Sequence, residues 1–407
     1  MDLTLDKRSY QPDRFKNSST QGRLRMLIIL SVGHALKHIF NSGFYILLPE
    51  MKATLGLNNA AIGTISTVRN VVGGVANLPA GYTADRYSAR FGQVLALAII
   101  AVGITQFMIG RSANFPQLLI FSSLMLVAVS FWHPPAIGAI SRIFSDRRGF
   151  AISIHGTGAS IGEAVGPILA GALLALVSWR ALAQWSLLPA ILFAVVLWVA
   201  LKPQTTPVPL VSFASYTKSF LRMLKDPKLL AILVIAAGFG AAQGVTFTFL
   251  PVYVREDLGQ SPWVVGAYVS LAQVVGIIAQ PIMGILSDNF GRKFVIIPSM
   301  IALGFGLLGL YIVGSGILFL VMLAATGAVL FSVMALILAA AGDLVTDEVQ
   351  ATAVSTLYLV VILFTGLSPV FAGFAADEYG VRSTFLIGSG LALAAGIFGM
   401  LVKWQKA

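Results

Sequence analysis

The sequence contains no cysteine and few charged residues. With 0 cysteines in 407 residues, disulfide frameworks, thiolate metal sites and cysteine nucleophiles are excluded. Charged residues make up 11% of the chain, whereas soluble proteins carry about 25%. The low charge excludes an ordinary soluble globule, and no Walker-type nucleotide loop is present. We therefore predict neither ATP-driven pumping nor a bound cofactor.

What the sequence does contain is a series of long apolar runs. Hydrophobic residues make up 57% of the chain. Runs of roughly 20 apolar residues can each cross a hydrocarbon core of about 30 Å. We predict an all-α membrane protein in the lipid bilayer, with about twelve transmembrane helices near residues 25–48, 61–83, 92–110, 116–140, 150–174, 182–201, 229–252, 263–286, 294–313, 316–341, 352–375 and 383–403.

Lysine and arginine are distributed unevenly between the connections. They gather near the two termini and in every second connection, and the connections on the opposite side hold few of them. The positive-inside rule therefore predicts that both termini are cytoplasmic, in a bacterial inner membrane. This placement also explains the net charge of +11, so we expect no nucleic-acid partner. We predict no cleavable signal peptide, because residues 1–24 contain no apolar core. We also predict a monomer.

The two halves of the chain form an internal repeat. Gly81 and Asp85 of the sequence GYTADRYSAR match Gly284 and Asp288 of GILSDNFGRK, 203 residues later. Three further matches at a separation of 202 or 203 residues are Leu48-Pro49 with Leu250-Pro251, Gly63 with Gly266, and Pro167-x-x-Ala170-Gly171 with Pro369-x-x-Ala372-Gly373. Parallel six-span repeats with a site at their interface occur in secondary transporters.

The repeat predicts the domain boundaries. We expect a cytoplasmic tail over 1–24, a six-helix bundle over 25–201, a linker with an amphipathic helix over 202–228, a second six-helix bundle over 229–403 and a short tail over 404–407.

With these repeated motifs, the chain resembles the major facilitator superfamily over nearly its whole length. The resemblance implies two pseudo-symmetric six-helix bundles that rock about a central cavity, which is the major facilitator fold. It also implies that the signature loops close the cytoplasmic side in the outward-open state. The residues that carry this implied gate are Gly81, Asp85, Arg86, Arg90, Gly284, Asp288, Arg292 and Lys293.

A narrower resemblance points to the fosmidomycin-resistance-like exporters of that superfamily. It depends on Trp132-His133-Pro134-Pro135, on the segment from Arg147-Arg148-Gly149 to Gly158, and on Gly162-x-x-x-Gly166-Pro167. This likeness implies an exporter.

Ionisable residues inside a span are costly and therefore face a cavity or a partner. A polar stripe within about a 100° arc runs down the first span and includes Lys37. Arg69 lies in the second span at a depth similar to that of Lys37, so these two residues are the cations of the predicted site. Two cations against the single carboxylate of Glu163 leave a surplus positive charge, which predicts an anionic substrate group. The predicted substrate-binding residues are Lys37, Arg69, His34, His38, Asn41, Tyr45, Gln243 and Tyr358.

Glu163 is the only acidic residue well inside the predicted hydrocarbon region. A carboxyl group there is typical of a proton carrier, and histidine titrates near neutral pH. We predict that Glu163 carries the coupling proton and that His133 or His155 relays it. His34 and His38 have metal-ligand spacing, but Lys37 lies between them, so we predict no metal site.

The predicted function is therefore secondary active transport of a small anionic organic solute, with proton-coupled export. The alternative is a proton-coupled exporter of cationic or amphiphilic drugs that uses Glu163 as the counter-charge. A channel and a membrane-embedded hydrolase are the alternatives from other classes. The hydrolase is disfavoured because its best nucleophile and base, Ser153 and His155, point about 200° apart on one helix.

Overall fold

The computed structural model describes residues 20–201, 227–344 and 350–402 of the chain. Side chains of 350–355 are outside this description. Most of the predicted tail at 1–24, nearly all of the predicted linker at 202–228 and the tail at 404–407 also lie outside the described residues.

The described N-terminal half is helical throughout. Its elements in chain order are α1 (Thr20–Leu55), α2 (Asn59–Arg86), η3 (Ser88–Arg90), α3 (Phe91–Arg111), α4 (Phe115–Ser130), α5 (His133–Ile143), α6 (Arg148–Leu174), α7 (Trp179–Trp185) and α8 (Leu187–Ala200).

The described C-terminal half is helical in the same way. Its elements are α10 (Pro227–Glu256), α11 (Pro262–Phe290), α12 (Arg292–Val313), α13 (Gly316–Leu330), α14 (Val333–Gly342), α15 (Gln350–Tyr379) and α16 (Ser383–Leu401).

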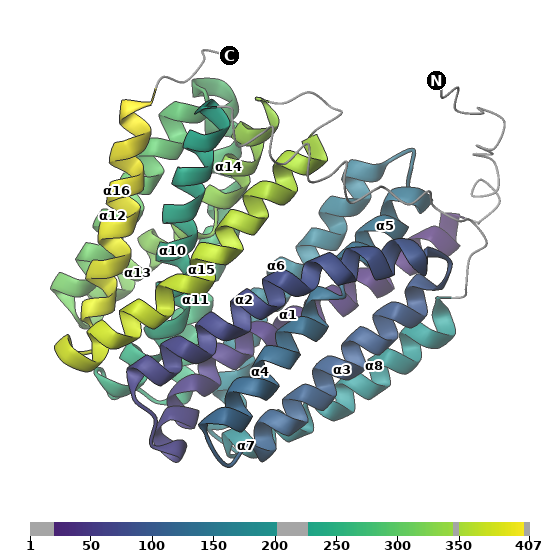
Figure 1. Cartoon of the computed structure of the whole chain (residues 1–407), viewed down its shortest axis with the longest axis horizontal. Coiled ribbons are helices and arrows are strands. Elements are labelled where there is room, and N and C mark those ends of the chain that lie inside the picture. Colours follow the sequence, from purple (N-terminus) through teal and green to yellow (C-terminus); the bar gives the residue numbers. More distant parts are fainter. Residues whose placement is uncertain (1–19, 202–226, 345–349, 403–407) are drawn as a thin grey trace, which may run out of the picture.

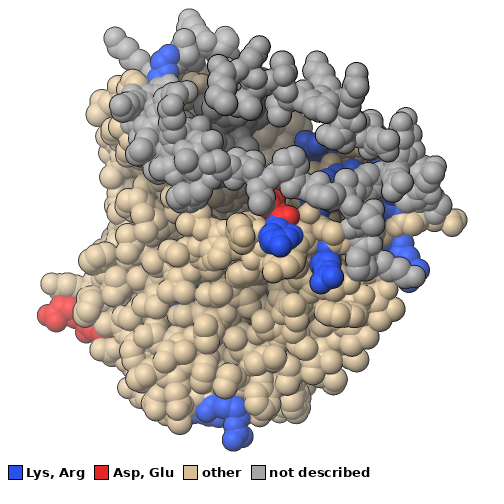
Figure 2. Space-filling view, turned by 45° about the vertical axis from the view of Figure 1, so that its right-hand side comes forward, with Lys and Arg blue, Asp and Glu red and all other residues tan. Residues whose placement is uncertain are grey.

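These helices confirm the all-α membrane fold. Ten helical stretches in the described residues are long and apolar enough to span a bilayer, and α1 and α2 run beside them with 36 and 28 residues. Three of the spans contain a break: α4 gives way to α5 at Phe131-Trp132, α7 to α8 at Ser186, and α13 to α14 at Phe331-Ser332. On the face in Figure 2, a broad band without lysine or arginine separates the blue side chains of the lower end from those above.

The two halves touch at one end and diverge toward the other (Figure 1). We call the end where α1 begins and α16 finishes the terminal side, and the opposite end the distal side. The halves meet where α2 crosses α15 and where α6 crosses α11, toward the distal side. Each crossing therefore packs the second span of one half against the fifth span of the other half.

Glycine and proline of the repeat form these two crossings. A Cβ on Gly63 would lie 2.2 Å from the carbonyl oxygen of Pro369, and one on Gly266 would lie 2.3 Å from that of Pro167. Only glycine therefore allows the backbones to approach this closely. Two of the matches that reveal the repeat in the sequence, Gly63 with Gly266 and Pro167 with Pro369, are thus residues at the interface between its two copies.

A hydroxyl group from the other half joins each crossing. Ser270 donates to the carbonyl oxygen of Ala164 at 2.7 Å and accepts from the amide of Ile168 at 3.1 Å, beside the proline in α6. The amide of Val370, beside the proline in α15, donates to the Thr67 hydroxyl at 3.2 Å. Proline interrupts the backbone hydrogen bonding of a helix, and these hydroxyls bond to groups next to the interruption.

A Gly63→Ala substitution is expected to separate the halves on the distal side, because the new methyl group meets backbone atoms that cannot move aside. Since the chain has no cysteine, a single cysteine in place of Gln273 between the halves gives a clean reporter. We expect faster labelling of that cysteine by an impermeant maleimide added from the distal side. Gly156→Ala is the control, since its methyl group would meet nothing within 4 Å. Equal labelling in both variants would contradict the role of Gly63.

Candidate functional site

A cavity of ≈ 170 Å³ lies between the two halves. The N-terminal half lines it with Asn41, Ser42, Tyr45, Asn70 and Glu163. The C-terminal half contributes neutral polar groups and apolar side chains, namely Thr246, Phe247, Leu250, Pro251, Val269, Ala272, Gln273, Leu323, Thr326, Gly327, Leu330, Phe331 and Thr365. The charged group in this lining therefore comes from the first half.

Arg69 lies directly behind this cavity. It is completely buried, and its guanidinium donates to the Asn41 side-chain oxygen at 2.5 Å and to the Tyr45 hydroxyl at 3.2 Å. Its charge also lies over the Phe44 ring, at 4.4 Å from the centroid. Among the described residues, no carboxylate lies within ion-pair distance of Arg69. A buried cation compensated only by neutral groups is costly and therefore attracts an anion.

Lys37 lies away from the cavity, in the same half. Its side chain is buried, and its ammonium donates to Nε2 of His133 at 2.8 Å. The two predicted cations are therefore in separate environments: Arg69 is beside two cavity-lining side chains, and Lys37 is beside a histidine.

Glu163 faces the cavity. Its side chain is 41% exposed although it lies deep in α6, because the cavity surface is open beside it. One carboxylate oxygen is 3.0 Å from Nδ1 of His38. A proton can pass between a carboxylate and an imidazole at this distance, and either group can hold it.

The remaining predicted histidines join this pair. Nε2 of His38 is 3.2 Å from Nε2 of His34, and Nδ1 of His34 is 2.9 Å from the carbonyl oxygen of His155. The His155 ring stacks on His34 with a centroid distance of 4.1 Å. Polar groups therefore lead from the cavity wall at Glu163 into the interior of the N-terminal half.

The structure separates the predicted substrate-binding residues into two sets. Asn41 and Tyr45 line the cavity. Those that the structure places outside its lining are His34, Lys37, His38, Arg69, Gln243 and Tyr358. Tyr358 is 45% exposed.

Asn70 and Thr246 line the cavity but were not among the predicted site residues. Gln273 also lines it, and its side-chain oxygen is buried without a hydrogen-bond partner among the described residues. Neutral polar residues are common in membrane helices, so the sequence holds no signal that marks Asn70 and Thr246.

The distal side of the cavity is closed by contacts between the halves. Lys52 pairs with Glu256 at 2.5 Å, and Arg255 pairs with Glu50 at 2.6 Å. The Asp377 carboxylate also accepts from two backbone amides at the start of α2, at 2.7 and 3.0 Å. Free amides at a helix N-terminus favour a carboxylate, so this contact adds to the ion pairs.

The predicted gate residues at the terminal side contact only their own half among the described residues. Arg292 pairs with Asp288 at 2.5 Å and with Asp343 at 2.8 Å, and Lys293 donates to the carbonyl oxygen of Val402 at 2.8 Å. Asp85, Arg86 and Arg90 are exposed. Nothing lies within 4 Å of a Cβ built on Gly81 or on Gly284. The structure therefore has its distal side closed and its terminal loops apart.

Reversing one charge of the distal closure is expected to open that side. Arg255→Glu would place a third carboxylate beside Glu50 and Glu256. Loss of a partly exposed pair weakens the closed state by about 1 kcal/mol, or about fivefold in the equilibrium. Distal labelling of the reporter cysteine at position 273 should rise accordingly. The double variant Glu50→Arg with Arg255→Glu should restore the original rate, and failure of this rescue would dismiss the pair as a closure.

Two six-helix halves around a cavity, closed on one side and apart on the other, are the architecture of membrane carriers. The chain belongs to the Major Facilitator Superfamily, whose family model matches residues 30–278 and 253–407. The expected family resemblance is thereby confirmed.

Individual proteins are also similar in sequence to parts of this chain. A probable nitrate/nitrite antiporter, NarK1, of Thermus thermophilus is 25% identical over 286 residues, which cover 67% of this chain and 62% of that protein. The fosmidomycin resistance protein of Escherichia coli K12 is 24% identical over 182 residues, or 44% of each chain. The chain thus spans less than two thirds of the length of these curated relatives.

The fold itself matches a solved structure over nearly its whole length. A bacterial homolog of the human lysosomal transporter Spinster, in an inward-facing and occupied conformation, superposes with a TM-score of 0.80. That match covers 94% of this chain and 97% of the other, at 18% sequence identity. The similarity establishes the major facilitator fold.

Proposed function

We propose that this transporter moves a small organic anion, in exchange for protons, out of the cell. The main support for this proposal is that Arg69 is a fully buried cation without a carboxylate partner among the described residues. Its two hydrogen-bond acceptors, Asn41 and Tyr45, line the cavity, so an anion could replace either of them with a small side-chain movement. Arginine matches the geometry of carboxylate and phosphonate groups. A relative of this chain is named for nitrate and nitrite, both anions, which supports this choice.

The neutral C-terminal wall of the cavity suits the rest of such a solute. Phe247 and Phe331 stack with a centroid distance of 5.4 Å, and Gln273 adds an unpaired acceptor. We propose that the acidic group faces the N-terminal half and the uncharged body faces this wall.

Proton coupling is assigned to Glu163 and His38. Their 3.0 Å contact lies at the cavity wall, where the shared proton can exchange with water in the cavity. His133 and His155 are proposed to relay protons within the same half, and the terminal side is proposed to be cytoplasmic. The structure would then be the inward-open state of an alternating-access cycle in a bacterial inner membrane.

A second candidate function depends on Glu163 itself. It is the charged side chain that lines the cavity directly, whereas Arg69 is behind it. A cationic drug could displace His38 and pair with this carboxylate. The exporter of cationic drugs is therefore the competing proposal.

A ligand screen separates the two proposals. Purified protein is tested by thermal shift against matched sets of organic anions and amines, and the hits are then followed in liposomes with an imposed pH gradient. We expect anions to stabilise the protein and their flux to follow the gradient. Stabilisation by amines alone would favour the competing proposal, and downhill flux that ignores a gradient of the exchanged solute would indicate a channel.

A further inference from the structure

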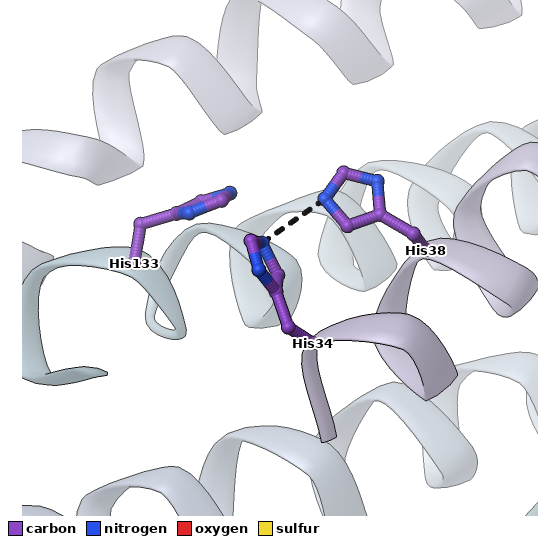
Figure 3. A group of neighbouring side chains, drawn as sticks. All are labelled: His34, His38 and His133. Carbon is purple, nitrogen blue, oxygen red and sulfur yellow. Dashed lines mark hydrogen bonds between the residues drawn. The ribbon is translucent and has the colours of Figure 1, made fainter. Parts of the chain in front are cut away.

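All histidines of this chain lie in one cluster. The sequence contains 4 histidines, and the ring centroid of His34 lies 4.8 Å from that of His38, 4.9 Å from that of His133 and 4.1 Å from that of His155. They come from three separate helices, α1, α5 and α6. Ring nitrogens of His34, His38 and His133 lie within 4.8 Å of one another, and Figure 3 shows the three side chains turned toward a common space.

Hydrogen bonds determine which nitrogens face that space. A backbone carbonyl can only accept, so Nδ1 of His34 carries the proton that it donates to His155, and Nε2 of a neutral His34 offers a lone pair. Nδ1 of His38 likewise faces the Glu163 carboxylate at 3.0 Å and leaves Nε2 on the inner side. A carbonyl or carboxylate on the outer nitrogen is the arrangement that orients histidines that bind a metal.

The spacing of the inner nitrogens of His34 and His38 fits two ligands of one ion. Tetrahedral ligands at the usual zinc–nitrogen distance of about 2.0–2.1 Å are about 3.3 Å apart. The two inner nitrogens of His34 and His38 are 3.2 Å apart. Facing lone pairs repel, so this contact needs a proton or a metal ion between them.

The third histidine, His133, is hydrogen-bonded to the Lys37 ammonium, which would compete with a metal ion for its ring nitrogen. Nε2 of His133 accepts from the Lys37 ammonium at 2.8 Å. The same lone pair can bind a metal ion if the lysine side chain moves away. The sequence alone offered only the pair on α1, with Lys37 between them; the fold adds His133 and the Glu163 carboxylate.

We propose that His34, His38 and His133 form a binding site for a divalent transition-metal ion, with the Lys37 ammonium as its competitor. Three imidazoles select zinc, cobalt, nickel or copper over magnesium and calcium, which prefer oxygen ligands. Because the fourth histidine, His155, belongs to the same cluster and the chain has no cysteine, imidazole or thiolate binding has no second location.

The test is a titration of the purified full-length protein, bearing no histidine tag, with Co²⁺ and then with Zn²⁺. Co²⁺ reports nitrogen ligation through its visible absorption, and Zn²⁺ binding is followed by calorimetry. We expect one ion per chain. His34→Gln and His38→Gln should each weaken binding on the order of 100-fold.

Two further variants distinguish ligation from general damage to the fold. Lys37→Met should tighten binding at least severalfold, because it removes the competitor and frees His133. Arg180→Ala should leave the affinity unchanged, since it removes a hydrogen bond to the Ser112 carbonyl at the distal side and touches no ring nitrogen of the cluster. This control keeps the test informative if a histidine variant on α1 does not fold.

The proposal is overturned if the wild-type protein binds neither ion, or if binding survives in both α1 variants. Weaker or unchanged binding in Lys37→Met would also dismiss it. The titration uses no transported solute, so its failure would leave the proposed transport function untouched.

Discussion

Replacing Arg69 with alanine is expected to weaken binding of the anionic solute on the order of 100-fold, with a matching loss of transport. The reason is the isolation of this cation: its contacts are the neutral oxygens of Asn41 and Tyr45, so the solute would be its only anionic partner. Binding is measured by calorimetry on purified protein, and transport in liposomes. Arg69→Lys, which keeps the charge but loses the planar fork, should retain part of the affinity.

The folded state should survive this substitution. Removing one member of a buried ion pair leaves an unpaired charge, but Arg69 has no charged partner among the described residues that could be left behind. Arg180→Ala is the matched control. Arg180 lies at the distal side, where it donates to the backbone carbonyl of Ser112, so its loss should lower stability and leave solute affinity unchanged. Normal transport by a folded Arg69→Ala variant would refute the anion site.

Glu163→Gln is expected to abolish proton-driven transport while solute exchange continues. Glutamine keeps the size of the side chain and can hydrogen-bond to His38, but it cannot release a proton. Uptake driven by an imposed pH gradient should therefore fall at least tenfold, whereas counterflow of labelled against unlabelled solute should remain. Both are measured in the same liposome preparation.

An exposed carboxylate provides the control for this second variant. Glu378 is exposed at the distal end of α15, and Glu378→Gln should respond to the gradient like the wild-type protein. If Glu163→Gln still follows the gradient, or if a protonophore leaves wild-type transport unaffected, the proton-coupling role of Glu163 would be wrong.

Much of the fold could be predicted from sequence because bilayer thickness and hydrocarbon constrain a membrane helix strongly. The repeat matches involving Gly63, Gly266, Pro167 and Pro369 also identified residues that lie at the crossings between the halves. The break at Phe331-Ser332 was not predicted, since the apolar run continues through it.

The candidate site was only partly predictable for a related reason. Helical periodicity placed Asn41 and Tyr45 on one face of α1, and both line the cavity. Periodicity cannot tell how far a side chain reaches toward its neighbours, so it did not show that Lys37 turns to His133 or that Arg69 lies behind Asn41. The distal pairs Lys52 with Glu256 and Glu50 with Arg255 join residues about 200 positions apart, and no local pattern marks them.

The most direct test of the central claim is an experimental structure of this transporter with its transported solute bound. We expect an acidic oxygen of the solute at hydrogen-bond distance from the Arg69 guanidinium, in place of Asn41 or Tyr45, with the uncharged body against Phe247 and Gln273. A solute whose cationic group contacts Glu163, while Arg69 keeps both neutral partners, would contradict it.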